Sequence, residues 1–167
     1  MGKILIIIAP EGYQDIEYND SKSEIEAKGH TVITASTEKT ARGKYGETKI
    51  VDILLKDVFP KDYDAIVFIG GPGSEVFFHN PLAHDLAKDF IKLKKPVAAI
   101  CAAPSILANA GLLKNKKVTC FPDQAENLKE KGALLTRKGV EKDGLIITAN
   151  GPASAKKFGK TVVAAIR

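Results

Sequence analysis

The chain of 167 residues is poor in the side chains that bind metals or cross-link small folds. It contains three histidines, two cysteines and no tryptophan. Two cysteines are too few for a disulfide framework, and the cysteines and histidines lack the ligand spacing of a zinc site. We therefore expect no metal, no cofactor and no disulfide, with Cys101 and Cys120 reduced at rest.

Long apolar runs are also missing. The longest, Ile4 to Ala9, ends at Pro10 and is far shorter than the ~20 residues that cross a bilayer. It is also too short, and lacks the small-residue cleavage site, for a secretory signal. The sequence therefore predicts a cytoplasmic protein with no membrane partner.

An excess of basic residues gives a net charge of +5, with 25 Lys and Arg against 20 Asp and Glu. The lysines are scattered among acidic residues, and no run combines basic side chains with aromatics as in a single-strand binder. We interpret the charge as solubilising surface and expect no nucleic-acid partner.

Short apolar runs recur along the chain and are rich in Ile and Val. Such runs are typical of parallel strands that are covered on both faces. Helical patterns separate several of them, and prolines lie near the expected starts or just beyond the ends of these helices. The sequence predicts one α/β domain, residues 1–167, with a mainly parallel open sheet and right-handed crossovers. The expected strands are Ile4–Ala9, Val32–Ala35, Ala65–Ile69, Val97–Ile100, Val118–Phe121 and Leu145–Thr148, and the expected helices cover 16–28, 82–93 and the segments after Pro104 and Pro152.

Ligands of such a fold bind beyond the carboxyl ends of the strands. There, an apolar strand runs directly into Cys101, with small residues at Ala99 and Ala103. This pattern is that of a nucleophile elbow with Cys in place of Ser. It would place the sulfur at the N-terminus of the Pro104 helix, where the helix dipole favours thiolate. The alternative is a small buried hydrophobic residue at a strand end.

A glycine pair, Gly70 and Gly71, follows the preceding strand. These residues allow a tight turn with exposed N–H groups, which suits a developing oxyanion or a phosphate. The loop lacks the Lys-Ser/Thr ending of a P-loop, which disfavours a nucleotide. A purely structural turn is the alternative.

Bases for a thiolate are few. His79 follows the glycine loop and could reach the elbow, with a surface role as the favoured alternative. No histidine follows His84, which excludes Cys-His-Glu amidotransferase chemistry. Carboxyl groups remain as proton donors, and the candidates are Glu11, Glu17 and Glu75.

These segments together resemble the DJ-1/PfpI superfamily, and the similarity spans essentially the whole chain. The matching residues are Gly70 to Gly73, Ala99 to Pro104, and Val140 to Gly144 leading to Ile147–Pro152. The resemblance implies a flavodoxin-like three-layer sandwich with helices on both faces, a reactive Cys101, and an oxyanion site made by backbone N–H groups of Gly71 and Ala102.

The resemblance also implies a homodimer, or a larger ring in which Glu75 reaches the neighbouring subunit's site. An aromatic of the Phe77–Phe78 pair is a candidate interface residue, with core packing as the alternative. Aligning Asp15-Ile16-Glu17 with the family's Asp-x-Glu puts Gln14 next to the sulfur, where members usually have Glu. We expect a pocket that includes Glu11, Glu17, Phe121, Asp123 and Pro152.

Two further departures concern the reaction. Ala102 stands where the protease-like branch of the superfamily has His. Phe121 stands where a second branch of the superfamily has a histidine in its pocket. Our leading hypothesis is a Cys101-dependent enzyme that acts on small reactive carbonyls or their protein adducts, as a glyoxalase or deglycase, or a PfpI-type hydrolase. Gln14 and Glu75 are its other catalytic candidates. The alternatives are a redox-responsive or chaperone-like protein with an oxidisable Cys101, and an oligomeric scaffold whose site has decayed.

Overall fold

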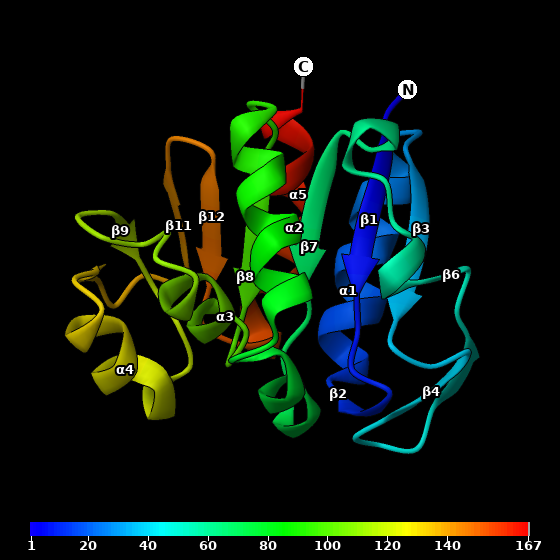
Figure 1. Ribbon diagram of the computed structural model, residues 1–167, viewed down its shortest axis with the longest axis horizontal. Coiled ribbons are helices and arrows are strands. Elements are labelled where there is room, and N and C mark those ends of the chain that lie inside the picture. The colour runs from blue at the N-terminus through cyan, green and yellow to red at the C-terminus, as the bar shows by residue number, and fades with distance from the viewer. Residues whose placement is uncertain (167) are drawn as a thin grey trace.

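A seven-stranded sheet forms the centre of the computed structural model, which describes residues 1–166 (Figure 1). The strand order is β11-β12-β8-β7-β1-β3-β6, and all neighbours are parallel except the β11–β12 hairpin. Every residue of β7, β8 and β12 is buried, as the continuous apolar runs predict for strands covered on both faces. The strands are β1 (Lys3–Ile7), β3 (Thr31–Ser36), β6 (Ile53–Leu54), β7 (Ala65–Phe68), β8 (Val97–Ile100), β11 (Val140–Asp143) and β12 (Ile146–Ala149).

Helices cover both faces of this sheet. Figure 1 shows α2 and α3 in front of the strands and α1 and α5 behind them. Helices α1 and α5 approach closely at Gly159, where an added Cβ would lie 3.0 Å from the Ser21 carbonyl oxygen. The structure is therefore the flavodoxin-like three-layer sandwich that the resemblance implies. The helices are α1 (Asp15–Ala27), α2 (Pro81–Lys92), α3 (Pro104–Asn109), α4 (Ala125–Glu130) and α5 (Ala155–Ala165), and the 3₁₀ turns are η1 (Leu55–Asp57), η2 (Pro60–Asp62), η3 (Pro72–Phe77), η4 (Pro122–Gln124) and η5 (Pro152–Ser154).

One predicted strand is wrong in length and in place. The run Val118–Phe121 contributes only β9 (Lys117–Val118), which pairs with β10 (Leu134–Leu135) outside the main sheet. The chain leaves the strand because its next amide groups bond elsewhere. The N–H of Thr119 donates to Oγ1 of Thr148, and the N–H of Phe121 donates to the carbonyl of Cys101. The strand beside β8 is consequently β12.

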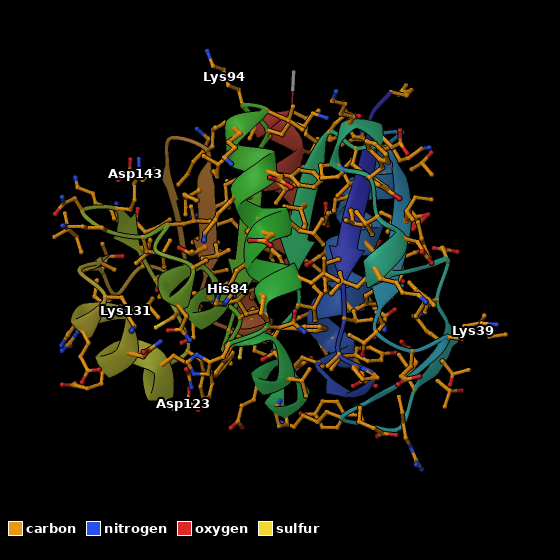
Figure 2. The ribbon with its side chains drawn as sticks, in the orientation of Figure 1. Lys39, His84, Lys94, Asp123, Lys131 and Asp143 are labelled. Carbon is orange, nitrogen blue, oxygen red and sulfur yellow. The ribbon has the colours of Figure 1, made fainter. Side chains whose placement is uncertain are left out.

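A small three-stranded sheet and helix α4 were absent from the sequence-based expectation. The sheet has the order β2-β4-β5 and consists of β2 (Glu11–Tyr13), β4 (Thr40–Gly43) and β5 (Thr48–Ile50). It extends from the carboxyl end of β1 (Figure 1). In Figure 2, Asp123 lies toward the carboxyl ends of the strands, whereas Lys94 and Asp143 lie at the opposite end of the molecule. No helix within residues 1–166 is long and apolar enough to span a membrane.

Candidate active site

Cys101 occupies a sharp turn directly after β8. Its φ of +66° lies in the left-handed region, which costs a non-glycine residue roughly 1–2 kcal/mol. Two backbone hydrogen bonds hold it there: its N–H donates to Ala149 at 2.8 Å, and its carbonyl accepts from Phe121 at 2.7 Å. The strained, fixed backbone is that of a nucleophile elbow.

Gly70 makes the close approach to this elbow possible. A Cβ added at Gly70 would lie 2.7 Å from both the Cβ of Cys101 and the Ile100 carbonyl oxygen. Real Cβ contacts of that length are essentially absent, so a larger residue would push the two loops apart. The glycine loop and the elbow therefore pack against one another, as their places after neighbouring strands predict.

Two backbone amides face the sulfur. Hydrogen bonds from the N–H groups of Gly71 and Ala102 lower the pKa of the Cys101 thiol. Gly71 has a φ of +98°, and its Cβ position is 2.6 Å from the Gln14 nitrogen, so glycine alone fits there. The sequence-based expectation named these same two amides for the oxyanion site.

The carboxyl group beside the sulfur belongs to Glu17. This side chain is completely buried, and its Oε1 accepts a hydrogen bond from the N–H of Gly70 at 3.0 Å. Its Oε2 has no hydrogen-bond partner among residues 1–166, and the neighbouring Cys101 thiol acts to lower the pKa of the carboxyl. Burial raises the pKa of Glu17 to about 7, although the hydrogen bonds from Cys101 and Gly70 act in the opposite direction. A proton is thus stored next to the nucleophile.

The pKa of the Cys101 thiol is raised, whereas the sequence-based expectation was a thiolate favoured by the helix dipole. Burial, followed by the charge of Glu17, raises the pKa of Cys101 to about 12, and the side chain is only 8% exposed. Helix α3, which was expected to favour thiolate, has only six residues. The two amide donors cannot overcome desolvation and the neighbouring carboxylate. The thiolate is favoured when the proton of the pair resides on Glu17, which then faces the sulfur as a neutral acid.

The expected contact between Gln14 and the sulfur is wrong. Gln14 precedes α1 in extended conformation, and its Oε1 accepts hydrogen bonds from Ile16 N at 2.7 Å and Glu17 N at 3.1 Å. It is the N-cap of the helix, and the third helical residue, Glu17, points to the sheet instead. An acid-rich first turn after a capping side chain was the sequence signal for this arrangement.

Gln14→Ala is therefore expected to remove a helix cap and leave the thiol chemistry in place. We expect the free energy of unfolding to fall by about 1 kcal/mol, because two amide donors at the start of α1 lose their acceptor. Urea unfolding measures this loss, and the pH dependence of Cys101 alkylation should match that of the parent protein. A displaced alkylation profile with unchanged stability would contradict the capping role.

Other predicted site residues lie apart from the sulfur. Glu11, Glu75 and Asp123 are exposed, and none of them is among the groups that shift the pKa of Cys101. Pro152 is half-buried at the start of η5. Phe121 is the exception, since its backbone bonds to the elbow while its side chain is 41% exposed. The structure thus brings together Cys101, Glu17, Gly70, Gly71, Ala102 and Phe121.

His30, His84 and the aromatic pair take structural positions, and His79 is exposed between η3 and α2. His84 Nε2 is 2.8 Å from the Phe78 carbonyl oxygen, and His30 accepts from the N–H of Gly2. Phe77 is buried within its own subunit and Phe78 is half-buried against the core, so core packing accounts for both. No group of three or more His, Cys, Asp or Glu residues within 1–166 is arranged to hold a metal ion.

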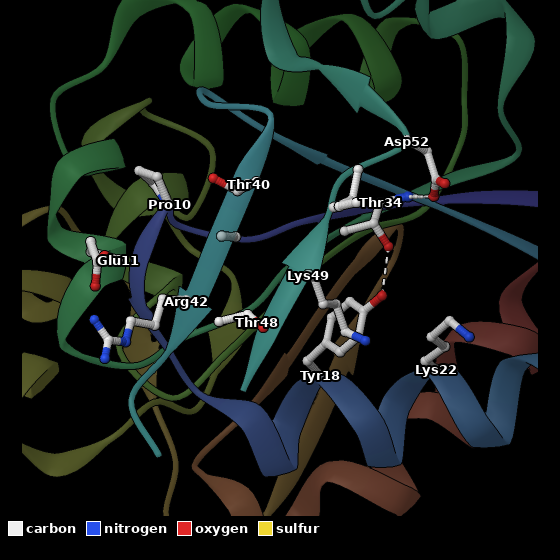
Figure 3. A pocket seen from close by; sticks show the side chains of 12 residues that line it. Pro10, Glu11, Tyr18, Lys22, Thr34, Thr40, Arg42, Thr48, Lys49 and Asp52 are labelled. Atoms are coloured by element: carbon white, nitrogen blue, oxygen red, sulfur yellow. Dashed lines mark hydrogen bonds between the residues drawn. The ribbon is translucent and has the colours of Figure 1, made fainter. Parts of the chain in front are cut away.

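A pocket of about 850 Å³ lies beside the small sheet, and Cys101 is not among the residues that line it (Figure 3). Tyr18 donates or accepts a 2.7 Å hydrogen bond with Thr34 there, and the Lys49 ammonium lies 4.8 Å from the Tyr18 ring centre. Size alone therefore does not mark the reactive site of this protein.

The fold and the elbow define an α/β protein with a strained cysteine at the carboxyl end of a parallel sheet. The model of the DJ-1/PfpI family matches residues 2–165, and the chain belongs to that family. An uncharacterized protein of Methanocaldococcus jannaschii is 40% identical, covering 98% of this chain and 82% of its own. The deglycase TK1284 of Thermococcus kodakarensis is 33% identical over 89% of this chain and 90% of its own. The crystal structure of a ThiJ/PfpI domain protein from Brachyspira murdochii superposes with a TM-score of 0.95, at 35% identity, covering 98% of this chain and 95% of that one.

Proposed function

We propose that this protein is a Cys101-dependent enzyme that acts on small reactive carbonyls or on the adducts they form with proteins. The proposal rests on three features that meet at one sulfur atom. They are the strained backbone of Cys101, the N–H groups of Gly71 and Ala102, and the buried carboxyl group of Glu17. The name of the related protein TK1284, a deglycase, supports this class of substrate.

The expected first step is addition of the Cys101 thiolate to an aldehyde carbon. A carbon–sulfur bond forms, and the carbonyl π electrons move to the oxygen. The amides of Gly71 and Ala102 stabilise the developing negative charge, and Glu17 transfers its proton to that oxygen, giving a neutral hemithioacetal. Glu17 takes the proton-donor role for which Glu11 and Glu75 were the other carboxyl candidates, since it is the acid beside the sulfur.

Peptide hydrolysis has less support. A peptide bond needs a proton delivered to the leaving nitrogen, and Ala102 supplies no side-chain acid at the position directly after the nucleophile. Self-association, including a role for the exposed Glu75 across an interface, stays a prediction from the resemblance.

The test is consumption of methylglyoxal by the parent protein and by Cys101→Ser. We expect Cys101→Ser to lower the rate at least tenfold, because a serine hydroxyl is a far weaker nucleophile at neutral pH. Lys56→Gln is the control, because Lys56 is exposed in η1 and is not among the residues of the mechanism or of its pockets, and it should retain the parent rate. Equal rates for the parent and Cys101→Ser would refute the proposed function.

A further inference from the structure

A second cavity of about 520 Å³ lies next to the elbow. Buried Cys120 and half-buried Asn150 form its inner part, and Leu135 and Thr136 form part of its wall. The exposed residues Lys129 and Arg137 lie at its rim. We call this cavity the rim-cation pocket. The mechanism above makes no use of it.

Two residues of the rim-cation pocket are sequence neighbours of residues that hydrogen-bond with the backbone of Cys101. The carbonyl of Cys101 accepts from the N–H of Phe121, and the residue before Phe121 is Cys120. The N–H of Cys101 donates to Ala149, and the residue after Ala149 is Asn150. Because both backbone bonds are 2.8 Å or shorter, the inner part of the pocket is fixed relative to the elbow. The lining does not include Cys101 itself, so only a substrate longer than a bare aldehyde could occupy both places.

The two charged side chains that line this pocket are both positive. Lys129 and Arg137 line it, and neither forms an ion pair with any residue in 1–166. Its lining includes no carboxylate, whereas the other three pockets contain at least one Asp or Glu each. Burial, with a smaller effect of Asp123, raises the pKa of Cys120 to about 11, so this thiol is neutral at physiological pH and does not repel an anion.

We propose that the rim-cation pocket binds a carboxylate of the substrate, so that the preferred substrates are carbonyl adducts bearing an anionic group. The class of substrate in this inference rests on the proposed function. The preference for a negative charge rests on the side chains that line the cavity. Arg137 is the main ligand, because its planar guanidinium can donate two parallel hydrogen bonds to a carboxylate. Polar Thr136 and Asn150 line the same cavity and can hydrogen-bond the rest of the adduct.

The first experiment compares two substrates that differ by one charge. These are the hemithioacetals of methylglyoxal with N-acetylcysteine and with N-acetylcysteine amide. We expect the kcat/KM of the acid to exceed that of the amide roughly fivefold, the size of one partly exposed ion pair. Arg137→Gln should reduce this ratio to about one. Arg42→Gln is the matched control, because it removes the same charge from a different pocket, and it should retain the ratio.

The second experiment needs no turnover. In Cys101→Ser, Cys120 is the only thiol of the chain, so its modification by methyl methanethiosulfonate at pH 9 reports on access to the pocket. We expect millimolar N-acetyl-S-methylcysteine to slow the modification several-fold and its amide to have little effect. Arg137→Gln should abolish the protection.

The outcomes separate the two proposals. If neither adduct is turned over in a Cys101-dependent reaction, the proposed function is wrong. Protection of Cys120 by the acid would still support the pocket in that case. The pocket inference is overturned if acid and amide protect equally, if neither protects, or if the acid preference survives in Arg137→Gln.

Discussion

Glu17→Gln is expected to stabilise the folded protein by about 3 kcal/mol at pH 8, and by less than about 1 kcal/mol at pH 5. The expected gain comes from removing a buried carboxyl group that must ionise. Burial raises the pKa of Glu17 from 4.5 to about 7 in the folded chain. Glutamine has nearly the same shape, stays neutral, and keeps an oxygen that accepts from the N–H of Gly70.

The direction of the pH dependence follows from proton binding. Between pH 4.5 and 7 the folded protein holds the proton of Glu17 and the unfolded chain releases it. Stability of the parent therefore falls as pH rises through this window and is level above it. Below pH 4.5 the carboxyl is protonated in both states, so the advantage of glutamine disappears.

Urea unfolding at pH 5 and pH 8 measures this difference. Glu11→Gln provides the control, since Glu11 is the first residue of β2 and is exposed. The control should change stability by less than about 0.5 kcal/mol at either pH. A stability gain for Glu17→Gln that is the same at both pH values would show that Glu17 is not a buried acid with a raised pKa.

The central strands could be predicted from the sequence because they are buried on both faces. Strands β7, β8 and β12 are short apolar runs, and no competing helical period obscures them. The short strands β2, β4 and β5 carry polar residues and alternate weakly, as in Thr48–Ile50. Their pairing depends on contacts far apart along the chain, which local pattern does not record.

The elbow was predictable because the cysteine and the residues that shape the turn around it are adjacent in sequence. Cys101, its small neighbours and the strand before it lie within a few residues, and the glycine loop precedes them by one crossover. The acid was harder to find, because the starting residue of α1 decides whether Gln14 or Glu17 faces the sulfur. A shift of three residues along the chain turns a side chain from the cap position to the buried face.

Gly71→Ala is expected to lower the free energy of unfolding by about 3 kcal/mol or more. Two costs add at this position. The φ of +98° is strained for alanine, and the new methyl group would lie 2.6 Å from both the nitrogen of Gln14 and the carbonyl oxygen of Gly12. Both contacts are to backbone atoms, so the segment 12–14, which we call the first loop, must move to accommodate the methyl group.

Gly111→Ala separates these two costs. Gly111 has a φ of +80°, and nothing lies within 4 Å of an added Cβ. This variant should therefore lose only the conformational term, about 1 kcal/mol. The additional loss in Gly71→Ala measures how closely the first loop and the glycine loop are packed.

The same pair of variants tests the connection between packing and chemistry. The N–H of Gly71 lowers the pKa of Cys101, so displacing it should slow Cys101 alkylation at pH 8, whereas Gly111→Ala should match the parent. Both proteins are compared in the absence of denaturant, where each is still folded. If Gly71→Ala unfolds no more easily than Gly111→Ala and alkylates at the parent rate, the glycine loop does not support the nucleophile. If stability and alkylation both fall, the fit between two backbone loops positions the donors on which the thiolate depends.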